Sequence, residues 1–129
     1  MIKAVKNVQT FTKDQINKFT KEISRLRAYA GGDCPEEAFI GINGAMEEGN
    51  PKPKSPLYVF TDAPPKKPSR VDDAIALALD TWTTVHMFYG RGCMRTPHSA
   101  YHSLVSETNG RELSFSSGAE IKLVINVAT

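Results

Sequence analysis

Acidic residues stand in two short segments of the chain where they could coordinate a divalent cation. The first segment, Gly-Gly-Asp-Cys-Pro-Glu, contains Asp33 and Glu36, and the second, Tyr-Val-Phe-Thr-Asp-Ala, contains Asp62. Hard cations such as Mg²⁺ prefer oxygen ligands, which carboxylates on two loops can supply. The same residues also have structural uses, because Asp33 and Glu36 have the spacing of a helix capping box. Asp62 could equally be a turn residue, so the residue types leave both interpretations open.

Cysteine and histidine offer a second chemistry. Cys34 could act as a thiol nucleophile if a histidine lay nearby to accept its proton. The three candidates for that base are His86, His98 and His102. No nucleophile-elbow string surrounds Cys34, however, and the position of His86 in the middle of an expected strand favours packing. We therefore predict no enzyme, and a small cytosolic α/β enzyme or redox domain using Cys34 is the alternative.

Strands and helices alternate along the chain, which predicts an α/β fold with a doubly wound sheet. The expected strands are residues 4–11, 57–60 and 84–89, with a short third strand around Leu113 and Phe115. The apolar run at 57–60 is typical of a strand covered on both faces. Because parallel strands end at one edge, the loops that carry Asp62 and Cys93 should lie together.

The expected helices follow Thr12, Pro35 and Ser69 and span about residues 97–108. Thr12 with Gln15, and Asp33 before Pro35, have the spacing of helix caps. Apolar residues recur at helical spacing and should face the core. They are Ile16, Phe19, Ile23 and Leu26 in the first helix, Phe39, Ile42 and Met46 in the second, Ile75, Leu79 and Trp82 in the third, and Tyr101, Leu104 and Val105 in the fourth.

The two acidic segments together give the chain a family resemblance. The pair GGDCPE and YVFTDA resembles the von Willebrand factor A domains of hemicentin-like proteins and, more distantly, the A-like domain of integrin β chains. The resemblance covers about residues 4–116 and implies a three-layer doubly wound fold. It also implies a magnesium ion at the carboxyl edge of the sheet. Asp62 resembles the acidic residue that ends the fourth strand, Glu36 resembles the carboxylate of the integrin β Asp-x-Pro-Glu loop, and Asp33 would be an outer or adjacent-site ligand.

The sequence departs from this family at its principal metal motif. The string Asp-x-Ser-x-Ser is absent, as are the first two strands of the family. We therefore predict an incomplete metal site that binds Mg²⁺ weakly or not at all. The missing strands should also leave residues 57–60 at a sheet edge, and exposed edges invite pairing with another strand. That strand could be residues 5–11 or a second chain, which would make a homo-oligomer.

The resemblance also extends to the cysteines. Hemicentin-like domains carry cysteines at places that match Cys34 and Cys93, which implies a disulfide and an oxidising compartment. The function implied is an extracellular adhesion module whose partner is a protein of the matrix. The first residues lack the apolar stretch of a signal peptide, so we expect an upstream region to be missing. A domain fragment without independent function is a further alternative.

Composition bounds the remaining classes of function. The chain has 129 residues and a net charge of +2, enough for one domain. We expect the domain to span residues 1–118, with a strand-like tail at 119–129. Residues 1–29 contain seven basic and two acidic residues, a net charge of +5, so the rest carries −3. A solvated basic helix explains this asymmetry, and we predict neither a nucleic-acid partner nor a membrane span.

Overall fold

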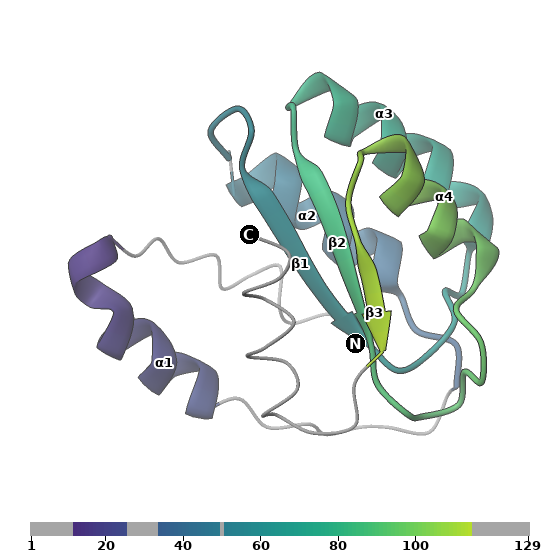
Figure 1. Ribbon diagram of the computed structural model, residues 1–129, viewed down its shortest axis with the longest axis horizontal. Coiled ribbons are helices and arrows are strands. Elements are labelled where there is room, and N and C mark those ends of the chain that lie inside the picture. The colour runs from purple at the N-terminus through teal and green to yellow at the C-terminus, as the bar shows by residue number, and fades with distance from the viewer. Residues whose placement is uncertain (1–11, 26–33, 50, 115–129) are drawn as a thin grey trace.

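The computed structural model describes residues 12–25, 34–49 and 51–114 (Figure 1). Its helices are η2 (Lys13–Gln15), α1 (Ile16–Arg25), α2 (Ala38–Gly49), η3 (Pro68–Arg70), α3 (Val71–Asp80) and α4 (Ser99–Glu107). Its strands are β1 (Pro56–Thr61), β2 (Thr84–Tyr89) and β3 (Glu112–Ser114). No helix within these ranges is both long and apolar enough to cross a membrane.

The three strands form one parallel sheet in the order β1-β2-β3. The register between β1 and β2 runs from Pro56 opposite Thr84 to Thr61 opposite Tyr89. Parallel strands cannot be joined by a hairpin, and here α3 and α4 are the crossover helices. The α/β fold class predicted from the sequence is confirmed.

The core lies between this sheet and the layer formed by α2, α3 and α4 (Figure 1). The helical spacing predicted its inward residues correctly in α2 and α4. The fully or almost fully buried side chains include Phe39, Ile42 and Met46 from α2, Val85 and Met87 from β2, and Tyr101, Leu104 and Val105 from α4. In α3 the smaller Ala74 and Ala78 are completely buried, which lets this helix approach its neighbours closely.

The opposite face of the sheet carries aromatic rings. Tyr58 stacks on His86 and Phe88 at centroid distances of 5.4 and 5.8 Å, and Phe60 stacks on Phe88 at 4.8 Å. The prediction that residues 57–60 are covered on both faces is wrong at Phe60, whose side chain is 47% exposed. Side chains alternate along a strand, so Phe60 points away from the helical layer that partly buries Val59.

The start of α2 differs from the prediction. The helix begins at Ala38 rather than near Pro35, because the backbone of Glu36 forms a parallel bridge to Pro65 instead of a helical turn. Asp33, the predicted cap, lies outside the described residues, as do the strand predicted at 4–11, Leu26, Phe115 and the tail at 119–129. The domain boundary at residue 118 therefore stays a prediction.

The first helix is less covered than its apolar spacing predicted. It is preceded by the predicted cap, in which the backbone N–H of Thr12 donates to Oε1 of Gln15 at 3.1 Å. Ile16 and Phe19 are 64% and 45% exposed. Helical periodicity therefore identified the helix but not the extent to which its apolar face is buried.

Trp82 is the clearest correction to the predicted core. Its side chain is 64% exposed, and that of Leu79 is 53% exposed. The helix ends at Asp80, so Trp82 lies beyond it, at the C′ position of a Schellman motif with φ of 54°. The N–H of Thr83 donates to the carbonyl of Ala78 at 2.8 Å, and that of Trp82 to the carbonyl of Leu79 at 3.3 Å. Glycine usually occupies this left-handed position.

We predict that Trp82→Gly is more stable than Trp82→Ala by about 1 kcal/mol, because only glycine adopts a positive φ without strain. Both variants remove the exposed ring, so their difference isolates the backbone. Urea denaturation followed by far-UV circular dichroism measures it. Equal stabilities, or a less stable glycine variant, would contradict the left-handed conformation of Trp82.

Candidate functional site

The loops that follow β1 and β2 meet at the carboxyl edge of the sheet. Asp62 comes directly after β1, and Cys93 lies four residues after the last residue of β2. The N–H of Gly90 donates to the carbonyl of Thr61 at 2.9 Å, and the N–H of Cys93 donates to the carbonyl of Asp62 at 3.1 Å. These bonds extend the pairing of the two strands into their loops, as the sequence predicted for parallel strands.

The segment before α2 joins the same edge through the backbone of Glu36. Its N–H donates to the carbonyl of Pro64 at 2.9 Å, and its carbonyl accepts from the N–H of Lys66 at 2.8 Å. This pairing brings the loop of Glu36 against the loop of Asp62, and both residues are exposed. The structure therefore places two of the three predicted acidic residues at one edge of the sheet.

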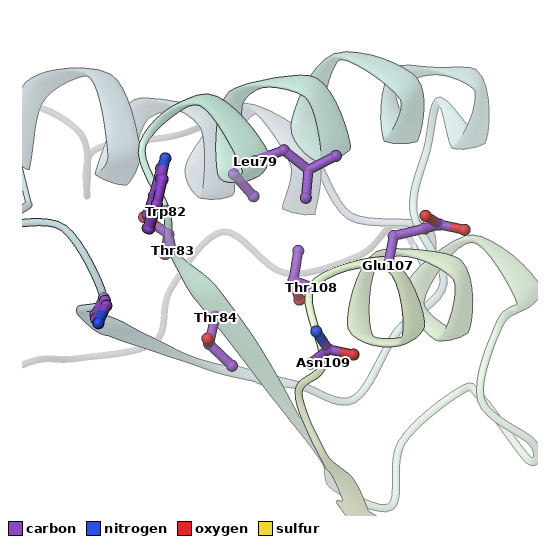
Figure 2. A pocket seen from close by; sticks show the side chains of 9 residues that line it. Leu79, Trp82, Thr83, Thr84, Glu107, Thr108 and Asn109 are labelled. Atoms are coloured by element: carbon purple, nitrogen blue, oxygen red, sulfur yellow. The ribbon is translucent and has the colours of Figure 1, made fainter.

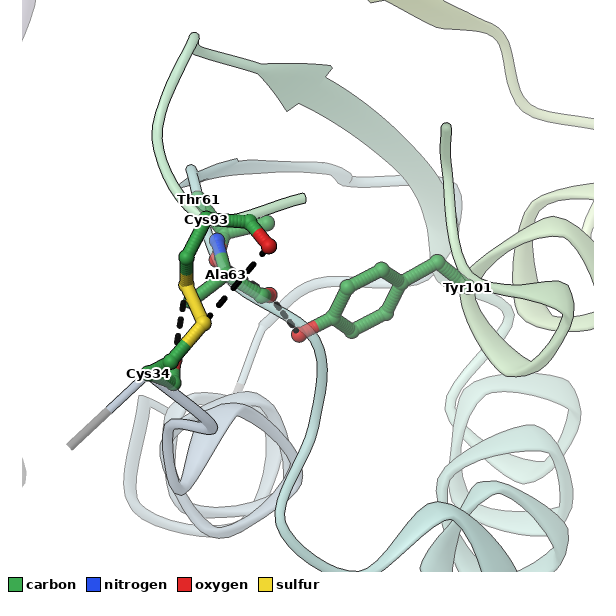
Figure 3. The surroundings of a disulfide bond; sticks show 5 residues. All are labelled: Cys34, Thr61, Ala63, Cys93 and Tyr101. Carbon is green, nitrogen blue, oxygen red and sulfur yellow. Dashed lines mark hydrogen bonds between the residues drawn. A yellow bond between two sulfur atoms is a disulfide. The ribbon is translucent and has the colours of Figure 1, made fainter. Parts of the chain in front are cut away.

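A disulfide between Cys34 and Cys93 ties these loops covalently (Figure 3). Their Cα atoms are 5.9 Å apart, although 59 positions separate the residues in the sequence. The Sγ of Cys93 lies 3.2 Å from the carbonyl oxygen of Cys34, and the Sγ of Cys34 lies 3.6 Å from that of Cys93. Disulfide sulfurs carry no hydrogen, so these are close contacts rather than hydrogen bonds.

Gly92 is a site residue that sequence reasoning missed. A Cβ atom at this position would lie 2.6 Å from both the backbone oxygen and Oδ2 of Asp62. The absence of a side chain at residue 92 therefore lets the second loop lie directly against Asp62. The glycines at 90 and 92 were a sequence signal for such a close approach.

Tyr101 of α4 connects the same loops to the core through a hydrogen bond. Its hydroxyl donates to the carbonyl of Ala63 at 2.9 Å (Figure 3), and its side chain is completely buried. The hydroxyl of Thr61 donates to the same carbonyl at 3.2 Å. Burial, and to a lesser extent the charge of Glu36, raises the pKa of Tyr101 to about 12, so the hydroxyl stays protonated and donates at neutral pH. Sequence reasoning placed Tyr101 in the core but did not identify this role of its hydroxyl.

The described residues include two of the three predicted metal ligands, Glu36 and Asp62. No group of three or more His, Cys, Asp or Glu side chains within them could hold an ion. Asp33 lies outside the described residues, and the Thr61 hydroxyl is already bonded within its loop. Mg²⁺ is often bound through one or two carboxylates and keeps several waters, so waters would have to complete its octahedral shell beside Glu36 and Asp62.

The histidines considered as general bases have other partners. Nδ1 of His86 accepts the N–H of Arg111 at 3.1 Å, and burial lowers the pKa of His86, with the charge of Arg111 adding to the effect. Nδ1 of His98 caps α4 by accepting the N–H of Ala100 at 3.0 Å. His102 contacts the carboxylate of Glu112. Cys34 offers no thiolate while it is bonded to Cys93.

Comparison with known proteins identifies one family. A family model described as von Willebrand factor A domain matches residues 5–126. Hemicentin-2 of Mus musculus is 43% identical over 54 residues, which cover 42% of this chain and 1% of hemicentin-2. The chain thus spans only a small part of that relative. No solved structure matches the chain.

We predict that Gly92→Ala destabilises the protein by about 1–3 kcal/mol, because the added methyl group overlaps the backbone of Asp62. Gly41→Ala in α2 is the control, since a Cβ there meets no atom within 4 Å. The control should raise the free energy of unfolding by about 0.5–1 kcal/mol. Thermal denaturation of both variants measures the two effects, and an equal change in both would contradict the contact.

Removing the disulfide should have a larger effect. The chain-entropy estimate for a loop of this length is about 4 kcal/mol, so Cys34→Ser/Cys93→Ser should lose approximately that much stability. Urea denaturation with and without a reductant measures the loss. The reductant should destabilise the wild-type protein and leave the double variant unchanged; the same response in both would contradict a disulfide that constrains the fold.

Proposed function

Because this chain belongs to the von Willebrand factor A domain family, we propose that it binds an extracellular protein through the loops at the carboxyl edge of its sheet. Domains of this family are mainly protein-interaction modules. The binding surface would consist of the loop around Glu36, the loop from Asp62 to Pro65 and the loop from Gly90 to Cys93. These three segments are named the edge loops below.

The observation that carries this proposal is the way in which the edge loops are held. Backbone hydrogen bonds join the loop of Glu36 to Pro64 and Lys66, and the disulfide joins Cys34, before α2, to Cys93, after β2. Loops fixed in this way lose little conformational entropy when a partner binds. The carboxylates of Glu36 and Asp62 remain exposed, so they are accessible to a ligand.

The disulfide supports an extracellular location. Disulfides form and persist in oxidising environments and are rare in the cytosol. Cys34 and Cys93 also link loops that lie on the exposed edge of the domain, where reductants would reach them. An adhesion module of a secreted or matrix protein accounts for both the family and this bond.

We further propose that the metal site of this chain is degenerate. Glu36 and Asp62, with Asp33, correspond to part of an adhesion-type ligand set, and the Asp-x-Ser-x-Ser string is absent from the sequence. Too few oxygen ligands leave a dication without sufficient compensation for its lost water. Recognition would then depend on the carboxylates and the loop backbones themselves.

A binding experiment with matched charge variants tests the proposed surface. The immobilised full chain is exposed to a panel of purified extracellular matrix proteins, and binding is followed by surface plasmon resonance. Glu36→Gln/Asp62→Asn should weaken binding about tenfold or more, because hydrogen bonds to charged groups are worth about 1.5–3 kcal/mol. Glu47→Gln/Glu48→Gln removes two exposed carboxylates from the far end of α2 and is the control.

The control variant should bind as the wild type does. Equal loss in both variants would show a general effect of charge, and no binding to any matrix protein would contradict the proposed function. A separate calorimetric titration with Mg²⁺ should show no saturable binding tighter than about 1 mM. Saturable binding below that concentration would contradict the degenerate metal site but leave the protein-binding surface standing.

A further inference from the structure

A hollow lies at the amino edge of the sheet, opposite the edge loops. It has a volume of about 350 Å³, and its lining includes Leu79, Trp82, Thr83, Glu107 and Asn109. This hollow is named the Trp82 pocket. Figure 2 shows Trp82 and Glu107 at its two ends, with Thr108 between them. The volume falls within the range of ligand sites, and the lining shares no residue with the edge loops.

Backbone strain in the described residues is concentrated at this pocket. Three non-glycine residues in the described part of the chain have a positive φ, namely Lys54, Trp82 and Asn109, and all three line the pocket. The strain is built into the ends of two helices, because Asn109 occupies at the end of α4 the position that Trp82 occupies at the end of α3. Asparagine is common at such a position and tryptophan is not.

The ring of Trp82 buries little of its surface in the folded protein and so contributes little hydrophobic stabilisation. It is 64% exposed, and the neighbouring Leu79 is 53% exposed. The backbone of Trp82 is nevertheless fixed, since its carbonyl accepts the N–H of Lys54 at 2.8 Å and closes the pocket against the loop before β1. A large apolar ring is therefore presented to solvent from a fixed backbone position, and exposed aromatic residues are frequent binding anchors.

The two helices that end at the pocket have acidic residues where basic residues are usually favoured. The helices α3 and α4 end at Asp80 and Glu107, and neither has a basic residue in its last turn. The carboxyl end of a helix carries partial negative charge and favours cations. Two helix ends and the carboxylate of Glu107 thus favour a cation here, and among the described residues that line the pocket Lys54 is the single lysine or arginine that opposes them.

We propose that the Trp82 pocket binds an arginine side chain presented by a partner protein. A planar guanidinium can stack on the indole face of Trp82, and its positive charge is favoured by the two helix ends and by the carboxylate of Glu107. An ammonium group is more strongly hydrated and is not planar, so it stacks on an indole less well. The pocket is independent of the edge loops, so this chain would carry two protein-binding surfaces at opposite ends of its sheet.

The chain contains one tryptophan, so intrinsic fluorescence reports on this pocket alone. The full chain is titrated with acetyl-Gly-Arg-Gly-amide and, as a neutral isostere, with acetyl-Gly-citrulline-Gly-amide. The arginine peptide should change Trp82 emission saturably, with a Kd on the order of 1 mM, and the citrulline peptide should bind about tenfold more weakly. Equal responses to the two peptides, or no saturable response to either, would overturn the proposal.

Variants separate the pocket from the fold. Glu107→Gln should weaken binding of the arginine peptide about fivefold, and Glu36→Gln at the opposite edge should leave it unchanged. Trp82→Gly should abolish binding although it relieves the backbone strain; here the amide signals of Thr108 and Asn109 in ¹H–¹⁵N spectra replace fluorescence. Retained binding in Trp82→Gly would contradict the role of the ring.

Trp82 fluorescence also tests whether a second copy of this chain occupies the pocket. If emission of Trp82 changes with protein concentration in the absence of peptide, and the arginine peptide does not reverse that change, self-association occupies the pocket and the proposal is wrong. Emission that is constant with protein concentration, together with the arginine-specific response, supports it.

Discussion

The parallel pairing of β1 with β2 is the constraint on which both surfaces of this protein depend. Its register is unbroken from Pro56 opposite Thr84 to Thr61 opposite Tyr89, and parallel strands must be joined by crossovers rather than hairpins. Strand ends therefore gather at one edge of the sheet, while the crossover helices α3 and α4 end near the other. The edge loops and the Trp82 pocket are two consequences of the same topology.

The edge loops are held by polar and covalent links more than by apolar packing. Asp62 accepts from Cys93, Glu36 pairs with the chain on both sides of Pro65, and the disulfide joins Cys34 to Cys93. Tyr101, which is buried in the core, connects to the loops through the hydrogen bond of its hydroxyl to Ala63. The exposed carboxylates contribute little to this framework, which leaves them available for recognition.

At the other edge, several local preferences are broken together. A tryptophan stands in a left-handed conformation, and two helices end on acidic residues without a compensating base in the last turn. Natural sequences usually satisfy such preferences, and the places where they do not are often functional. The stability of this domain comes from the buried layer of α2, α3, α4 and β2, which can tolerate strain at its margin.

The sequence by itself predicted most of the described elements, much of the core and the edge at which the loops of Glu36 and Asp62 lie, because apolar periodicity and the polarity of parallel strands are local properties. The tertiary structure decided what depends on distant partners. The backbone of Glu36 pairs with Pro64 and Lys66 instead of starting a helix, and Gly92 packs against Asp62. Trp82 continued the apolar pattern of α3, but the helix ended two residues earlier and turned its ring into solvent. Periodicity records which residues could face a core, whereas only the packed chain fixes where each helix stops and which side chains the core has room to cover.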